Sequence, residues 1–312
     1  MEKRSIYLPE GDLMDTLENK AAVATIADLK QAQLDGTLLE GRVIRCDLDR
    51  NLIVQLPCGE AIIPHDEGAI GIAEGTAREI ALLTRVNKPV CFLVLGFEET
   101  ADGVRPILSR RLAQMQCKQQ YIRHLQLGDV IPARVTHLDT FGVFCDVGCG
   151  LTALLPITDI SVSRIAHPSA RFMVGWHIKG VVSSLENDRI CLSHRELLGT
   201  WEENAARFRV GEIVVGIIRS VETYGVFVEL APNLAGLAEA HENAKVGQQA
   251  SVYIKSILPD KMKIKLAIID TQDSDDQPPP PSYFINDGPI DYWRYTPAAC
   301  TRVIERRFVR EN

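Results

Sequence analysis

The chain has 312 residues, of which 46% are hydrophobic and 24% charged, and its formal net charge is −7. This is ordinary globular chemistry, with enough length for two or three domains. The acidity argues against a protein that coats nucleic acid indiscriminately, and no segment reaches the roughly 18 apolar residues of a membrane span. The charged start has no apolar stretch behind it, so it is not a signal peptide, and we expect a cytoplasmic protein.

Residues 1–35 carry four basic and seven acidic side chains, and the stretch 10–33, rich in Ala, Leu and Lys, predicts a leading helix. Residues 36–111 consist of short β-branched runs separated by Gly, Asp, Asn and Pro, which predicts a small β barrel. Alternation along its second strand predicts three core residues: Leu52, Val54 and Leu56.

Residues 112–126 predict a helical connector, within a stretch from 103 to 128 that has no acidic side chain. Five basic side chains give this stretch a local charge of +5: Arg105, Arg110, Arg111, Lys118 and Arg123. They could add phosphate contacts to a nucleic-acid site, with an affinity that falls with salt because neutralised phosphates release counterions. A solvated helix face is the alternative.

An internal repeat covers residues 127–195 and 208–269, and a second helical connector, 196–207, joins the two copies. "LQLGDVIPARVTHLDTFGVFCDVG" (125–148) aligns without a gap with "FRVGEIVVGIIRSVETYGVFVELA" (208–231). The 36–111 segment is a weaker third copy. The repeat predicts a mainly β fold of three tandem five-stranded barrels with helical connectors.

After the third unit, residues 270–282 ("DTQDSDDQPPPPS") form an acidic, proline-rich linker that cannot build a core. Residues 283–312 are aromatic and then basic. Their sequence predicts no particular elements, so we expect an irregular C-terminal tail.

The strand "TFGVFCDVG" (140–148) has two different faces. One face is apolar and belongs in a core: Val143, Cys145 and Val147. Phe144 and Asp146 share the other face, where an aromatic ring costs solubility unless something stacks on it. Unpaired bases do so, with roughly 1–3 kcal/mol per base and little regard for sequence.

The same arrangement occurs twice, as two aromatic pairs: Phe141 with Phe144, and Tyr224 with Phe227. Recurrence at one spacing favours a binding role over packing against a connector helix or a neighbouring barrel. We expect a bulge at Gly142 and at Gly225 to turn each strand so that both rings face outward. The first unit has Arg50 and Ile53 at the equivalent positions and therefore lacks the pair.

The second unit, "LGDVIPARVTHLDTFGVFCDVGCGLTALLPITDIS" through "RICLS", resembles the S1 RNA-binding domain, an OB-fold barrel. The connector "LSHRELLGTWEENAARFRVGE" resembles the bacterial small-subunit ribosomal S1 family itself, in the short form of Gram-positive-type bacteria. The match covers roughly residues 36–268 and is stronger for the second and third units than for the first.

The resemblance implies that single-stranded RNA contacts the four rings and a cation on the last strand of each barrel, Arg189 or Lys263. Such a cation can hold a phosphate or stack on a base, although a solvated strand charge is equally ordinary. Lys261 and Lys265 flank the second of these and look like additional phosphate contacts. Three lysines in five residues could also guard a strand edge.

The chain departs from the family pattern in the polar half of the site. The family's histidine is Pro156 here and Glu239 in the third unit, and its aspartate is Leu185 and Pro259. Stacking is unaffected by these changes, so we expect weak, sequence-tolerant binding by each domain.

In the family, the leading units dock onto the small ribosomal subunit. The resemblance therefore implies that residues 36–111, with the acidic segment 1–35, contact the subunit, although a degenerate barrel that fills space is the alternative. We expect a non-catalytic RNA-binding protein of translation that binds single-stranded mRNA. A ribosome-independent regulator or RNA-decay accessory and a protein-binding scaffold are the competing hypotheses.

Neither a catalytic site nor a cofactor is expected. "GCGLTA" (148–153) matches a dinucleotide-binding pattern, but Pro156 interrupts any helix that could follow. The eight cysteines show no CxxC pairing and the histidines no metal-ligand spacing, which favours free thiols over a disulfide framework or a metal site.

Overall fold

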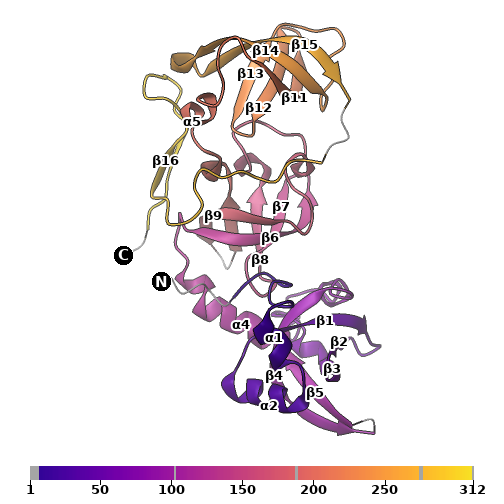
Figure 1. The fold of residues 1–312 in the computed structure, drawn as a ribbon. Coiled ribbons are helices and arrows are strands. Elements are labelled where there is room, and N and C mark those ends of the chain that lie inside the picture. The colour runs from indigo at the N-terminus through magenta and orange to yellow at the C-terminus, as the bar shows by residue number, and fades with distance from the viewer. Residues whose placement is uncertain (1–6, 102, 187–188, 274–276, 311–312) are drawn as a thin grey trace. The chain divides into compact units, whose positions relative to one another are not determined.

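The computed structural model describes residues 7–101, 103–186, 189–273 and 277–310, and its strands form three closed five-stranded barrels in sequence (Figure 1). In each barrel the strands follow the closed order one, two, three, five, four, with the third strand parallel to the fifth. This is the Greek-key order of an OB fold. The mainly β fold of three tandem OB barrels is therefore confirmed.

The first barrel contains β1 (Leu39–Cys46), β2 (Leu52–Leu56), β3 (Gly59–Ile63), β4 (Pro89–Thr100) and β5 (Gly103–Ser109). The second contains β6 (Val130–Asp139), β7 (Gly142–Asp146), β8 (Thr152–Pro156), β9 (His177–Glu186) and β10 (Arg189–Ser193). The third contains β11 (Ile213–Glu222), β12 (Gly225–Ala231), β13 (Leu234–Ala238), β14 (Gln249–Leu258) and β15 (Lys263–Gln272).

The helices are short. They are α1 (Leu17–Ala22), α2 (Ile26–Asp35), α3 (Ile80–Leu83), α4 (Arg110–Gln120) and α5 (Trp201–Ala205), with 3-10 turns that include η5 (Arg195–Leu198) and η6 (Pro259–Lys261). No helix within the described ranges has the length and apolar character that crossing a membrane requires. All eight cysteines are free, five of them buried and three partly exposed.

The chain divides into two compact units. The first takes the chain up to Leu125 together with Asp146–Thr152, and the second takes Gln126–Cys145 and everything from Ala153 onward. The first unit therefore holds the first barrel, and the second unit holds the third barrel, the tail and most of the second barrel.

The leading segment forms two helices, so the single helix expected over residues 10–33 is wrong. The chain breaks at Val23, and the Thr25 hydroxyl then accepts a hydrogen bond from the Asp28 backbone N–H to cap the start of α2. Gly36, with φ of +62°, ends α2. Leu29 is fully buried and packs with the core of the first barrel, so these helices are part of that unit.

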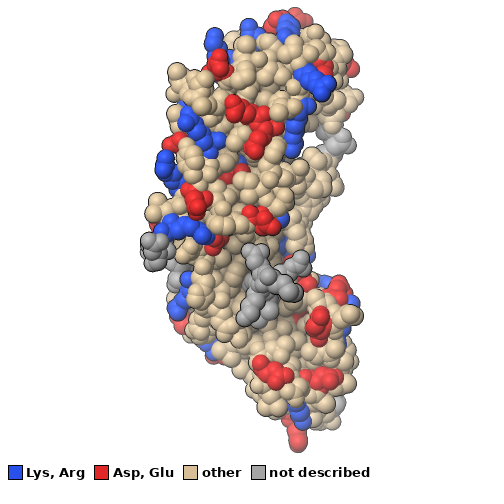
Figure 2. Space-filling model, turned by 60° about the vertical axis from the view of Figure 1, so that its left-hand side comes forward, with Lys and Arg blue, Asp and Glu red and all other residues tan. Residues whose placement is uncertain are grey.

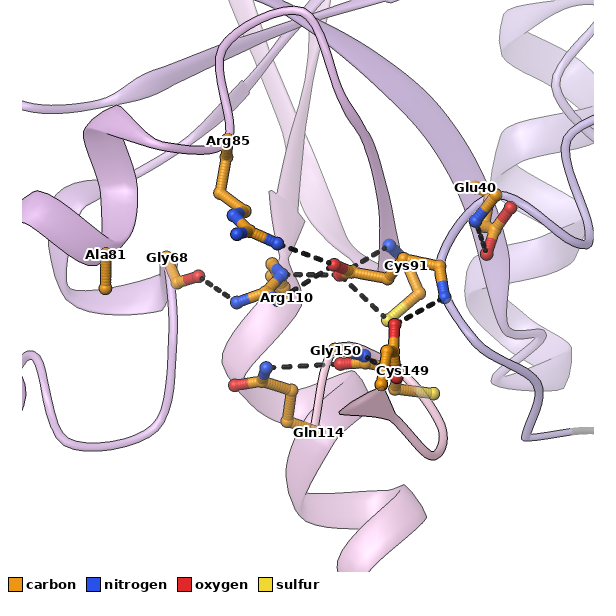
Figure 3. Close-up of polar contacts among 12 residues, drawn as sticks. Glu40, Gly68, Ala81, Arg85, Cys91, Arg110, Gln114, Cys149 and Gly150 are labelled. Atoms are coloured by element: carbon orange, nitrogen blue, oxygen red, sulfur yellow. Dashed lines mark hydrogen bonds and ion pairs between the residues drawn. The ribbon is translucent and has the colours of Figure 1, made fainter. Parts of the chain in front are cut away.

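A buried ion pair lies within the first unit, among the polar contacts of Figure 3. Arg110 donates from Nε and Nη2 to the two carboxylate oxygens of Glu10, at 2.6 and 3.0 Å, and Arg85 lies 3.4 Å from the same carboxylate. Neighbouring basic side chains are also paired, Arg105 with Glu98 and Arg111 with Glu67. Three of the five cations in the 103–128 stretch are thus engaged by carboxylates, and the stretch is not the free phosphate-binding surface considered above.

The prediction that Asp146 lies beside Phe144 on the outer face is wrong, because Asp146 is buried. Its carboxylate accepts hydrogen bonds from the backbone N–H groups of Glu10, Gly148 and Gly150, at 2.7, 2.8 and 3.0 Å. These donors replace water, which makes burial of the carboxyl group tolerable.

Glu40 holds the same N-terminal segment through the backbone N–H groups of Gly11, Leu13 and Met14. Burial, with the charge of Glu10 as a further cause, raises the pKa of both Asp146 and Glu40 to about 7.

The second unit includes the tail, which is mostly irregular, as expected, apart from one short two-stranded sheet. Tail strands β16 (Tyr292–Arg294) and β17 (Glu305–Arg307) pair antiparallel, and Figure 1 shows the tail in yellow alongside the third and second barrels. Its buried side chains belong to the same core cluster as the interior of the third barrel: Ile290, Trp293, Tyr295 and Phe308. Arg306 fixes the tail to Asp159 at 3.1 Å and to the fully buried Glu196 at 3.2 Å.

Stability of the first unit should fall as pH rises from about 4 to about 7. The folded state keeps protons on Asp146 and Glu40 that the unfolded chain releases near the ordinary carboxyl pKa, so their contribution is present below that value and lost through pH 7. Each group changes the unfolding free energy by at most about 1.4 kcal/mol per pH unit.

Asp146→Asn keeps an oxygen acceptor and removes the titration. Urea unfolding followed by far-ultraviolet circular dichroism between pH 4 and 8 should give the variant a shallower decline than the parent chain. An unchanged slope would contradict the assignment of this pH dependence to Asp146.

Candidate nucleic-acid interface

The interiors of the second and third barrels are filled by alternate residues of their second strands. Val143 and Cys145 in β7, and Val226 and Val228 in β12, are fully buried. Because strand side chains alternate, Phe144 and Phe227 stand on the outside, where both are partly exposed. The core residues predicted from the pattern of β7 are confirmed.

Phe144 and Phe227 are the inner rings of two pairs, and each is accompanied by a more exposed outer ring at the preceding hairpin tip. Phe141 is 52% exposed and Tyr224 66% exposed. The rings of Phe141 and Phe144 meet edge to face, with centroids 5.8 Å apart and planes at 87°, and those of Tyr224 and Phe227 at 6.2 Å and 89°. In each pair one ring supports the other and a ring face stays open to solvent.

The glycine between the paired rings is needed because a neighbouring strand passes close by. A Cβ on Gly142 would lie 2.5 Å from the carbonyl oxygen of Leu155, and one on Gly225 would clash with the carbonyl oxygen of Ala238. The bulge expected at Gly225 is wrong, since Gly225 pairs in register with Glu222 and the irregularity in this hairpin lies in β11, between Ile218 and Ser220.

His137 adds a third ring to the second barrel, and the sequence analysis missed it. It is exposed and stacks on Phe144, with centroids 6.1 Å apart and planes at 26°. The repeat contained the signal, because the aligned residue Ser220 is paired with Phe227 in the third barrel.

The strand register makes Arg189 and Lys263 equivalent positions. Leu237 of β13 pairs with Phe227 on one side and with Lys265 on the other, which sets these three side chains in one row across the sheet. In the second barrel the corresponding leucine, Leu154, pairs with Cys191. Arg189 and Lys263 each lie two residues before that partner, on the same face.

Four cations expected to contact RNA are exposed: Arg189, Lys261, Lys263 and Lys265. Among the described residues no carboxylate lies within ion-pair distance of any of them. Figure 2 shows basic and acidic side chains interspersed over the face in view rather than a continuous basic surface. Glu239, which replaces the family's histidine, is paired with Lys255 at 2.7 Å.

The ring pair of the third barrel opens into a cleft of about 530 Å³ within the second unit. Strands β11 to β13 supply part of the wall, and residues 162–164, α5 and the tail supply the rest. Two exposed arginines line it from outside the barrel, Arg164 and Arg302. Sequence analysis missed both, because their proximity to Tyr224 depends on how the tail packs.

The first barrel offers no comparable platform. Ile53, at the position of the inner ring, is only 3% exposed, and Arg50 lies 3.6 Å from Glu79. The predicted core residues Leu52, Val54 and Leu56 are buried as well, so β2 is buried on both faces along most of its length.

Comparison with known protein families identifies the class to which the second barrel belongs. Residues 124–195 match the family model described as the S1 RNA binding domain. An S1-type barrel is therefore present where the sequence indicated one.

More than half of the chain is similar to the bacterial small ribosomal subunit protein bS1. It is 28% identical over 206 residues to the bS1 homolog of Bacillus subtilis, covering 60% of this chain and 53% of that protein. It is 30% identical over 193 residues to bS1 of Staphylococcus aureus, covering 56% and 49%. The resemblance to the S1 family is confirmed, and the chain spans about half the length of these two relatives.

A solved structure from Streptococcus pneumoniae, described as a multidomain protein with nucleic acid binding domains, is similar over 75% of this chain and 74% of that chain. Its sequence identity is 15% and its TM-score 0.25, values too low to carry an argument.

Gly142→Ala should destabilise the second barrel by about 1–3 kcal/mol, because the added methyl group must displace the Leu155 carbonyl. Gly96→Ala is the matched control, since Gly96 also lies in a strand and has nothing within 4 Å of an added Cβ. Hydrogen exchange resolved by peptide should show faster exchange in β7 and β8 for Gly142→Ala only. Equal, small effects of the two substitutions would refute the close-approach explanation.

Proposed function

We propose that the chain binds single-stranded RNA on the outer faces of its second and third barrels. The observation that carries the proposal is the repeated pair of perpendicular, solvent-exposed rings, each beside a cation that no carboxylate neutralises within the described structure. Membership of residues 124–195 in a domain family named for RNA binding supports it.

Binding would combine stacking with phosphate contacts. An unpaired base stacks on the open face of Phe141 or Tyr224, while the inner ring holds the outer one in place. Arg189 in one barrel, and Lys261, Lys263 and Lys265 in the other, contact phosphates or a second base. Stacking distinguishes poorly between bases, so the sequence preference is weak.

Two weak sites in one unit reinforce each other. Asn233, fully buried at the β12–β13 turn, donates to the carbonyls of Arg195 and Gly199, at 2.8 and 2.9 Å, and accepts from the Val162 N–H at 2.9 Å. These bonds join the third barrel to segments of the second. The first contact of a strand of RNA therefore raises its effective concentration at the other site.

The bS1 relatives are named for the small ribosomal subunit, and we extend that association to this chain. Because the first barrel has no comparable ring pair, we propose that this barrel and the acidic segment 1–35 contact the subunit. Such a protein would act in the cytoplasm, hold single-stranded mRNA near the subunit and catalyse no reaction.

Alanine at Phe141 and Phe144, or at Tyr224 and Phe227, should weaken binding of a single-stranded RNA 12-mer by about 1–3 kcal/mol for each stacked base lost. Fluorescence anisotropy at two salt concentrations measures it. Tyr253→Ala, which removes a 40% exposed ring from β14 of the third barrel, is the control and should bind as the parent does. Unchanged binding in all variants would leave a protein-binding scaffold as the better hypothesis.

The variant that lacks all four rings also tests the ribosomal role. It should sediment with small subunits through a sucrose gradient as the parent chain does, because the proposed contact lies in the first barrel. Failure of the parent chain itself to sediment with subunits would favour a ribosome-independent regulator or decay accessory.

A further inference from the structure

The cleft beside Tyr224 and Phe227 is larger than a stacking platform needs. Its volume of about 530 Å³ falls within the range of roughly 300–1,000 Å³ that small-molecule sites occupy. One wall carries the two rings, and Met262, at the turn that leads into β15, contributes to the rim. The cleft therefore has room for a whole nucleotide, with its sugar and phosphate.

Three segments that are distant in sequence build this cleft. The barrel supplies the rings, residues 162–164 come from the loop after the second barrel's β8, and Tyr295, Arg302 and Ile304 come from the tail. All of them lie in the second unit. The Tyr295 hydroxyl donates to the carbonyl of Asn233 at 2.5 Å, so the residue that anchors the loop also anchors the tail.

The charges in the cleft favour an anion. Its charged side chains are Arg164, Arg219, Arg302 and Glu222. Arg219 is already engaged, because it donates from Nε and Nη2 to both carboxylate oxygens of Glu229, at 3.0 Å each, a carboxylate that it shares with Arg171. Arg164 and Arg302 are exposed, and the described residues provide neither with an ion-pair partner, which leaves two free guanidinium groups against one carboxylate.

We infer that this cleft is a composite nucleotide subsite, in which a base stacks on Tyr224 or Phe227 and Arg164 and Arg302 hold the adjacent phosphates. A guanidinium group binds phosphate through paired, charge-assisted hydrogen bonds, which suits it to this place. The inference rests on the proposed function and deepens it: the third barrel binds RNA jointly with the tail and a loop of the second barrel.

The two RNA sites are then unequal in character. The ring pair of the second barrel is accompanied by His137 and Arg189, both contributed by the barrel's own strands. In the third barrel's site, the arginines come from the loop at residues 162–164 and from the tail. This site therefore requires that the tail packs against the barrel. The short tail sheet and the Arg306 ion pairs consequently serve binding as well as folding.

Arg164→Gln and Arg302→Gln, made in the full chain, test the inference with a single-stranded RNA 12-mer of uridines and another of adenosines. Each substitution should weaken binding of both oligomers roughly three- to tenfold, because a lost phosphate contact weakens binding uniformly across sequences. The slope of log affinity against log salt should become shallower by about 0.7 for each arginine removed.

Arg307→Gln is the matched control, because it removes an exposed arginine from the same tail that does not line the cleft. It should leave affinity within twofold of the parent. Arg164→Gln and Arg302→Gln variants that behave like Arg307→Gln, while alanine at Tyr224 and Phe227 still weakens binding, would overturn the composite subsite alone. If alanine at all four rings has no effect either, the proposed RNA-binding function fails with it.

Discussion

Strand alternation is the constraint that determines where the aromatic rings lie. The inward positions Val143 and Cys145 in β7, and Val226 and Val228 in β12, are fully buried. The residue between each two of them must therefore face outward, and in both strands that residue is a phenylalanine, Phe144 or Phe227. The close passage of a neighbouring strand at Gly142 or Gly225 accompanies a second ring beside each.

The barrels differ in what they do with polar groups. The first unit buries Glu10, Arg110, Glu40 and Asp146 in a connected network that fixes its N-terminal segment and exposes no ring pair. Removing one partner of such a buried ion pair typically costs about 3–5 kcal/mol, so the network specifies one arrangement of this segment. The second unit buries its polar groups where segments meet, notably at Asn233, and leaves its cations at the ring faces unpaired.

The sequence predicts the barrels well because the internal repeat shows which residues occupy equivalent strand positions in two units. Alternation fixes the core face, and an aromatic pair at one spacing in two aligned units marks the outer face. Even the matching of Arg189 with Lys263 agrees with the strand register. His137 could have been found in the same way, by asking which residue of the aligned strand faces the inner ring.

Other features depend on contacts between distant segments, which periodicity does not encode. Asp146 follows the alternation of β7 yet is buried, because the N-terminal segment presents a backbone N–H to it. The sequence alone places Arg110 on a basic surface, whereas in the structure Glu10 forms an ion pair with it. The tail has few residues and little regular structure, so only its packing against the third barrel shows that it brings Arg302 close to Tyr224.

The most direct test of the account is photo-crosslinking of the full chain to single-stranded RNA that contains 4-thiouridine, followed by mass spectrometry of the crosslinked peptides. Contact of bases with the two ring pairs predicts crosslinks at residues 137–144 and 224–227. Crosslinks confined to the first barrel, or absent from both ring pairs while RNA is bound, would contradict it.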